Sequence, residues 1–304
     1  MFAHLGTIFA LIGHTLYAAV HVADRLVVTS AMPNEYVYAF WVGFIPVPAA
    51  IVLLPFLAPV SATIVLISLA SGAAFTIGNV FHFRAMRHME VTRVAPFIGA
   101  MVPIFTYLLA WYYFGEALPG SANIGFGLLV FGSVIIGFSY PATKRTQHVA
   151  MTIADMCISA LFYAGCFVLA KYAYDNAPFI QSFTWGLVGS GIPAIAMLFS
   201  HGFRKALKED SQRKRTKFEW LLLSNKVFSA MAFILLHLAT ALTSATLVQS
   251  IQGLQYMLVL VIALYMGRNY PSILNENLRG KHMFLAVIAI ACILAGLGLL
   301  GIHS

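Results

Sequence analysis

Ten apolar stretches of about twenty residues, separated by short polar breaks, fill this chain almost from end to end. They cover residues 5–23, 36–58, 61–83, 94–114, 121–140, 150–170, 179–200, 219–240, 243–266 and 282–302. A helix rises about 1.5 Å per residue and the hydrocarbon core of a bilayer is about 30 Å thick, so each stretch is long enough to span it. Backbone groups in hydrocarbon must also satisfy one another. The pattern therefore predicts an all-α polytopic membrane protein with ten transmembrane helices.

The composition favours the same class. The chain is 61% hydrophobic and 9% charged, whereas soluble domains are about 25% charged. Its longest polar segment, residues 201–218, is too short to fold alone. The N-terminal segment 1–13 has no Lys or Arg and no small-residue cleavage site, so it is interpreted as an uncleaved first helix. The three cysteines lie inside apolar stretches and are expected to pack as small apolar residues rather than form disulfides or bind metal.

The net charge of +8 does not point to nucleic acid, because the basic residues lie in short connections between spans. Alternate connections hold 16 of the 18 Lys and Arg, and seven of these fall between Arg204 and Lys217. Lys171 and Lys226 are interpreted as helix-end residues on the opposite side. The positive-inside rule then predicts that the basic connections are cytoplasmic and that both termini are outside. The 204–217 cluster is expected to anchor this orientation beside anionic headgroups.

Several local patterns recur at nearly constant separation, which predicts two five-span halves, residues 1–146 and 147–304. Ile45-Pro46 is echoed by Ile192-Pro193, and Gly-rich final spans close both halves. Because each half has an odd number of spans, the second would enter the bilayer from the opposite side as an inverted repeat. That architecture is typical of secondary transporters with alternating access to a central site. No GxxxxGK[ST] motif for ATP is present.

The residues around the third and fourth spans carry a family resemblance. The segments 83–96, 101–105 and 114–118 resemble the EamA-like members of the drug/metabolite transporter superfamily. The resemblance implies a ten-helix transporter in which helices 1–4 and 6–9 surround a substrate cavity, with the fifth and tenth at the periphery. The chain departs from the family pattern at Arg268, which stands where the first half has Glu116, and in the predicted external position of its termini. Glu116 is interpreted as a structural charge at the end of span 4.

Span 1 contains the strongest group of candidate site residues. His14, Tyr17, His21 and Asp24 follow a 3–4–3 spacing, which places them on one helical face. Facing a cavity, they would bind a polar substrate or relay a proton, because histidine titrates near neutral pH. The alternative is that the histidines only hydrogen-bond to neighbouring helices. No third ligand at diagnostic spacing supports a metal site, and no cofactor is predicted.

Other polar residues inside the spans are also candidates, because ionisable and amide groups are costly in hydrocarbon. Each has a functional and a structural interpretation. The amides and His82 would contact substrate or hydrogen-bond to a neighbouring helix, and Lys226 would be a cation in the cavity or snorkel to the interface. The tryptophans would line the cavity wall or anchor the helices at the interface. Asp155 would pair with Lys226 or carry a proton. The set is Asn79 and His82 in span 3, Asp155 in span 6, Lys226 in span 8, Gln249, Gln252 and Tyr256 in span 9, and Trp41 and Trp185 in spans 2 and 7.

The leading functional hypothesis is a secondary transporter, and more specifically an exporter, of a small polar or amphipathic metabolite such as an amino acid, coupled to protons or running downhill. A flippase for a lipid-linked head group and a passive uniporter or channel remain alternatives. No HExxH or GxSxG motif supports an enzyme. The expected partners are the substrate and the bilayer, with the chain as monomer or homodimer. Compact connections favour a multi-pass protein of the bacterial inner membrane.

Overall fold

The computed structural model describes residues 2–27, 34–89, 91–115, 120–138, 149–212, 219–269 and 281–301. Every regular element within these ranges is helical. The helices are α1 (Phe2–Leu26), α2 (Glu35–Phe44), α3 (Pro46–Leu53), the short 3₁₀ helix η2 (Leu54–Phe56), α4 (Ala62–His88), α5 (Val91–Phe114), α6 (Gly120–Phe138), α7 (Val149–Asn176), α8 (Phe179–Met197), α9 (His201–Ser211), α10 (Glu219–Leu242), α11 (Ala245–Ser250), α12 (Gln252–Asn269) and α13 (Lys281–Gly301).

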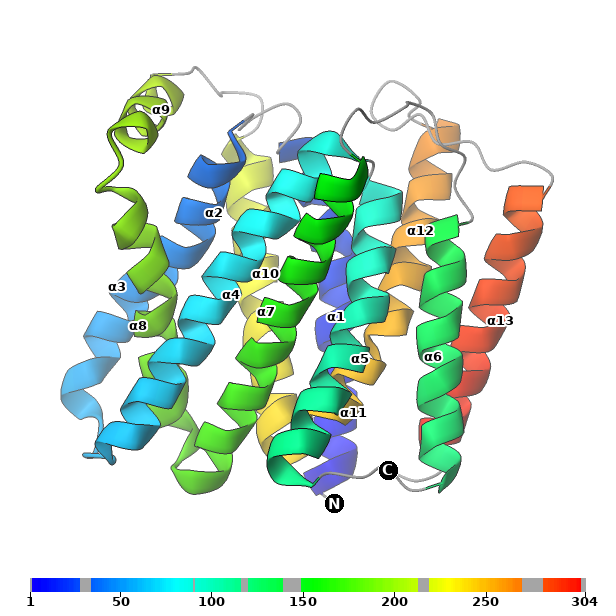
Figure 1. Cartoon of the computed structure of the whole chain (residues 1–304), viewed down its shortest axis with the longest axis horizontal. Helices are drawn as coiled ribbons and strands as arrows, with labels where there is room; N and C mark the ends of the chain where they lie inside the picture. Colours follow the sequence, from blue (N-terminus) through cyan, green and yellow to red (C-terminus); the bar gives the residue numbers. More distant parts are fainter. Residues whose placement is uncertain are drawn as a thin grey trace.

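The described helices confirm a polytopic α-helical membrane protein. Seven spans in the described part of the chain are long and apolar enough to cross a membrane, or eight if α8 and α9, bent by 101°, count as one. The described apolar parts of α6 and α13 are shorter, covering Asn123–Gly132 and Val287–Gly296. The count of ten spans and the inverted repeat therefore stay predictions. The long helices run side by side, with the start of α1 and the end of α13 opposite α9 (Figure 1).

Two spans are each divided into two helices. The span Glu35–Phe56 breaks between α2 and α3 at Ile45, where Pro46 lacks an N–H and fits the first turn of a new helix. The second interruption separates α11 from α12 at Ile251. Pro96 and Pro103 in α5 and Pro193 in α8 lie inside helices that continue through them.

Glycines allow α4 and α8 to approach closely. A Cβ on Gly72 would lie 1.8 Å from the carbonyl oxygen of Gly186, and one on Gly189 would lie 2.2 Å from that of Leu69. Neither position therefore accommodates a side chain without moving backbone. Hydrogen bonds extend this contact to α2: Thr76 Oγ1 donates to Ser190 O over 2.7 Å, and Ser190 Oγ to Gly43 O over 2.9 Å. The term α4–α8 seam is used below for this glycine contact.

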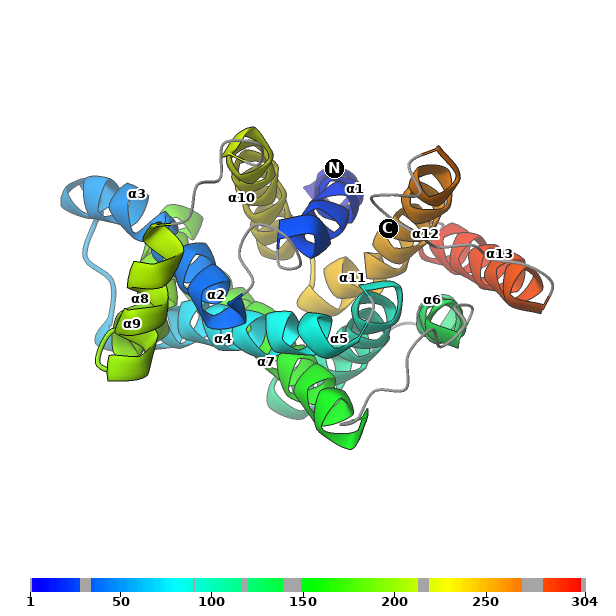
Figure 2. The same cartoon turned by 90° about the horizontal axis from the view of Figure 1, so that it is seen from above.

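Seen from above, α6 and α13 pack on each other at one edge of the molecule, beside α5 and α12 (Figure 2). Glycine also shortens this contact, since a Cβ on Gly296 would meet Gly125 O at 2.7 Å. The remaining helices pack as α4 with α7 and α1 with α10, and α11 and α12 lie against α5. The structure does not describe Glu116, the basic residues at 213–217 or the side chain of Arg268.

Candidate functional site

A polar cavity of about 80 Å³ lies between α1, α4, α7, α10 and the α11–α12 break. The cavity lies beside the junction of α11 and α12 at Ile251, and transporter sites are typically placed at such divided spans. Polar and ionisable side chains line much of it. They are His14, Tyr17, His21, Asp24, Asn79, His82, Tyr163, Lys226, Ser229, Gln249, Gln252, Gln255 and Tyr256.

His14 is held between two acceptors on the broken span. Its Nδ1 lies 2.9 Å from Gln255 Oε1, and its Nε2 lies 2.9 Å from Val248 O. A neutral imidazole donates from one nitrogen only, so both contacts are donated only by the imidazolium form. In the neutral form, the Gln255 amide would have to turn and donate its NH₂ to Nδ1. Proton binding at His14 is thus linked to the orientation of Gln255.

His21 lies about two turns further along α1 than His14. It stacks on His82 of α4, with ring centroids 5.3 Å apart. The rings of Tyr17 and Tyr256 also stack on His21. On α7, the Tyr163 hydroxyl lies 3.1 Å from His82 Nδ1 and donates to Asn79 Oδ1 over 3.1 Å. The stacked aromatic rings hold the imidazole of His21 in its plane, while the Tyr163 hydroxyl joins α7 to α4 by hydrogen bonds.

A charged cluster closes the cavity toward the α9 end of the bundle. Asp24 accepts hydrogen bonds from Tyr38 Oη and from Asn225 Nδ2, the latter over 2.7 Å. Lys226 Nζ donates to Tyr38 Oη over 2.9 Å and lies 4.0 Å from the centre of that ring. The phenol therefore bridges the ammonium and the carboxylate, which form no direct ion pair in the described structure. One of the three donors of Lys226 has a protein acceptor, and two remain available to a ligand.

Four further polar atoms around this cavity are buried without a hydrogen-bond partner among the described residues. They are His21 Nδ1, His82 Nε2, Gln249 Nε2 and Gln252 Oε1. Buried polar groups are normally satisfied, and leaving one unsatisfied costs about 1–3 kcal/mol. Their convergence on one cavity is typical of a site whose ligand completes the hydrogen bonding.

A second, apolar cavity of about 250 Å³ adjoins the first, between α2–α3, α8 and α10. The two cavities share Val42, Phe75, Lys226 and Ser229 as wall residues, so they are contiguous. Apolar side chains from three helices dominate the rest of its wall, among them Ile45, Pro46, Phe183 and Phe233. This second cavity is called the α3–α10 opening below. Lys226 lies at the junction of the polar and apolar spaces.

The structure brings most of the predicted site residues to the polar cavity, but three lie elsewhere. Trp41 packs on Phe40 and Phe44, Trp185 is half-buried on α8, and neither lines the cavity. Asp155 pairs with Arg84 rather than with Lys226: Arg84 Nε lies 2.7 Å from Asp155 Oδ2, and a second contact joins the same side chains.

The position expected for Lys226, at a helix end away from the basic connections, is wrong. Lys226 lies about two turns into α10, which begins at Glu219 near the α9 end (Figure 1). The polar boundary before span 8 made a terminal position plausible, but burial against Tyr38 holds the ammonium inside. No three His, Cys, Asp or Glu side chains gather as metal ligands within the described ranges.

Sequence reasoning did not identify Tyr38 and Tyr163 as site residues. A tyrosine within an apolar helix has no periodic polar signal, because its ring resembles the surrounding residues. A usable signal was Asp24, whose carboxylate requires donors from neighbouring spans. Tyr38 and Asn225 supply them.

Comparison with known proteins now identifies the class. Residues 151–301 match the model of the EamA-like transporter family, which is part of the drug/metabolite transporter superfamily. The chain belongs to this family. It is thus a membrane transporter of the drug/metabolite type. A protein of known crystal structure, 13% identical in sequence, shares the fold of this EamA-like chain with a TM-score of 0.66 over 97% of this chain and 99% of that one. Comparison with curated proteins finds no sequence match.

Proposed function

We propose that this EamA-like protein is a secondary transporter that exports a small polar or amphipathic metabolite by alternating access, with proton coupling through the histidines of α1. The polar cavity is the substrate site in this proposal. The observation that carries it is the set of unpartnered buried polar atoms, together with two free donors of Lys226, around one cavity.

The chemistry of the wall favours a ligand with both hydrogen-bonding and acidic groups. Gln249 and Gln252 offer amide donors and acceptors, and Lys226 offers a cation. An ammonium in a low-dielectric wall is stabilised by an added anionic acceptor more than it would be in water. Amino acids and related organic acids have these groups.

Proton coupling follows from the two imidazoles. Binding a proton at His14 changes which Gln255 orientation is hydrogen-bonded, and Gln255 belongs to the broken span beside Gln249 and Gln252. A proton and a substrate would thus act on the same α11–α12 segment. Alternating access turns such a linkage into coupled transport.

The test is flux in proteoliposomes containing the purified chain, with radiolabelled amino acids and other organic acids as substrates, with and without an imposed pH gradient. We expect saturable uptake of at least one substrate, driven by the gradient.

Gln249→Leu, which removes an unpartnered amide of the cavity, should lower uptake at subsaturating substrate about tenfold if one hydrogen bond worth about 1.5 kcal/mol is lost. Gln212→Leu is the matched control, because Gln212 is exposed at the end of α9. Absence of protein-dependent flux for every compound, or equal flux in both variants, contradicts the proposal.

A further inference from the structure

The α3–α10 opening continues the polar cavity toward the outside of the bundle, and it has a different chemistry. α10 packs mainly on α1 and α7, whereas the space toward α3 holds the apolar cavity of about 250 Å³. Ile45 on one side of the opening and Ile234 on the other are both strongly exposed, at 47% and 43%. In a bilayer, these side chains face lipid.

From this geometry we infer that the α3–α10 opening is a lateral binding site for the hydrocarbon part of an amphiphilic organic anion, whose acidic head group lies at Lys226 in the polar cavity. The inference rests on the proposed transport function and names the substrate class for it. The substrate is thus a single-chain amphiphile that enters from the bilayer, not a fully hydrophilic metabolite.

Size supports a ligand that spans both spaces. The polar cavity, at about 80 Å³, holds only a head group, while ligand pockets are usually about 300–1,000 Å³. The apolar opening adds about 250 Å³ directly beside it, which brings the combined space to the lower end of that range. A ligand that used the polar space alone would have few atoms and few contacts.

Depth supports entry from the hydrocarbon region. The span Glu35–Phe56 places Ile45, Pro46 and Ala49 near its midpoint. On α10, the wall extends from Lys226 to Ile234, in the middle part of a helix that runs from Glu219 to Leu242. The opening therefore lies at the level of acyl chains. A hydrocarbon tail there stays in an apolar surrounding and loses none of its transfer free energy.

Lys226 determines the sign of the head group. It is the charged wall residue that the two cavities share, and two of the three donors of its ammonium have no acceptor among the described residues. Tyr38 separates it from Asp24, so an incoming carboxylate or phosphate can approach the cation without displacing an ion pair. A cationic amphiphile would meet an unfavourable charge at the same point.

The experiment uses the full chain in lipid nanodiscs and a dodecanoate with a diazirine near the end of its chain. After photolysis, peptide mass spectrometry locates the adducts. We expect labelling on the α8 and α10 segments that contain Phe183 and Phe233. Excess dodecanoate should suppress it, and dodecyltrimethylammonium should not. Adducts spread evenly over lipid-facing helices, or suppression by both amphiphiles alike, would overturn the inference.

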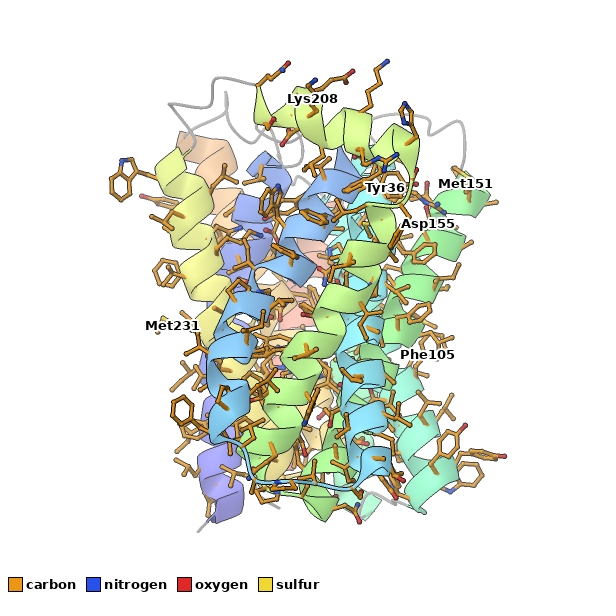
Figure 3. The ribbon with its side chains drawn as sticks, turned by 90° about the vertical axis from the view of Figure 1, so that its left-hand side faces the viewer. Tyr36, Phe105, Met151, Asp155, Lys208 and Met231 are labelled. Atoms are coloured by element: carbon orange, nitrogen blue, oxygen red, sulfur yellow. The ribbon has the colours of Figure 1, made fainter. Side chains whose placement is uncertain are left out.

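Neighbouring substitutions on α10 provide the matched control. Ala230 lines the opening, whereas Met231 is 49% exposed and points away from the bundle (Figure 3). Ala230→Trp should reduce the suppressible labelling by about tenfold or more, because an indole fills the space at a cost above 1.4 kcal/mol. Met231→Trp should leave it unchanged. Ala49→Phe fills the opening from α3 and provides a second test if the first variant does not fold.

The outcome is separable from that of the proposed function. If wild-type proteoliposomes transport a hydrophilic acid and Ala230→Trp does so equally well, transport stands and the lateral site is rejected. If no flux is found while labelling remains saturable, anion-selective and sensitive to Ala230→Trp, the lateral site stands and the transport proposal is rejected.

Discussion

The α4–α8 seam and the α3–α10 opening are formed by helices that the predicted inverted repeat would relate to each other. In the seam, glycines bring two backbones into contact, and Gly72 leaves no room for a Cβ. In the opening, the corresponding helices are separated by an apolar space. The proposed alternating access requires that the two pairs, which the predicted repeat would relate, pack differently in any one state. Exchange of the two arrangements would then move access from one side of the membrane to the other.

The spans α2–α3 and α8, which the predicted repeat would relate to each other, also differ in continuity. The span α2–α3 borders the opening and is divided at Ile45-Pro46, while α8, which lines both the seam and the opening, continues through Pro193. These are the two dipeptides that echo each other in the sequence. They also lie close together, since a Cβ on Gly191 would meet the Val47 side chain at 2.5 Å. We interpret the divided span α2–α3 as the one that can change its angle, and the continuous helix α8 as the element against which it moves.

The largest expected effect comes from breaking the seam. Gly72→Ala should destabilise the protein by more than about 3 kcal/mol or prevent folding, because its Cβ would overlap the Gly186 carbonyl and backbone must move. Thermal unfolding of the purified protein in detergent measures this. Gly165→Ala on α7 is the control, because nothing lies within 4 Å of its Cβ, and it should change stability by less than about 0.5 kcal/mol. Equal melting temperatures for the two variants would show that the seam is not tightly packed.

The next effect concerns the cation at the opening. Lys226→Met should lower the affinity for an anionic substrate about 10- to 150-fold, the value of one charged hydrogen bond of 1.5–3 kcal/mol. It also leaves Asp24 buried without a countercharge, so stability should fall as well. The double substitution Asp24→Asn with Lys226→Met removes both charges. It should recover stability but not affinity. Recovery of both would mean that Lys226 only balances Asp24.

How far the sequence predicts this molecule depends on the kind of signal. Hydropathy places the helices, because burial in lipid requires long apolar runs, and the 3–4–3 spacing puts His14, Tyr17, His21 and Asp24 on the face that lines the cavity. Pairings between distant spans have no such signal. Asp155 with Arg84, and Tyr38 with Lys226, depend on which helices are neighbours and at what height. The α3–α10 opening is harder still to predict from the sequence, because it arises where α3 and α10 are separated by a space rather than packed together.

Two ion pairs of α4 differ in burial and should therefore differ in their contribution to stability. Arg84 joins α4 to α7 through Asp155, which is 1% exposed, whereas Arg87 joins α4 to α2 through Glu35 and is 42% exposed. Figure 3 shows Asp155 toward the α9 end of the bundle. Asp155→Asn should cost about 1–3 kcal/mol, less than a fully buried pair because Arg84 is 28% exposed. Glu35→Gln should cost no more than about 1 kcal/mol. A larger loss of stability for Glu35→Gln than for Asp155→Asn would contradict this ranking by burial.

The smallest effect, a change in the shape of a pH profile, comes from the histidines between the two regions. Transport should depend on pH between about 5 and 8, where histidine ordinarily changes charge. His21 has a free ring nitrogen and stacks on His82 of α4, while His14 is held by Gln255 and Val248. His21→Gln keeps hydrogen bonding but cannot titrate. It should flatten the profile with little loss of stability, since the Nδ1 atom of His21 has no hydrogen-bond partner among the described residues. His14→Gln should also lower stability by about 1–3 kcal/mol, because it disturbs two buried contacts.

Flux measured in proteoliposomes across this pH range, together with melting temperatures, separates a coupling role of the histidines from a structural one. If the double variant keeps the wild-type profile, both histidines are structural, and the protein is a uniporter or couples through Asp24.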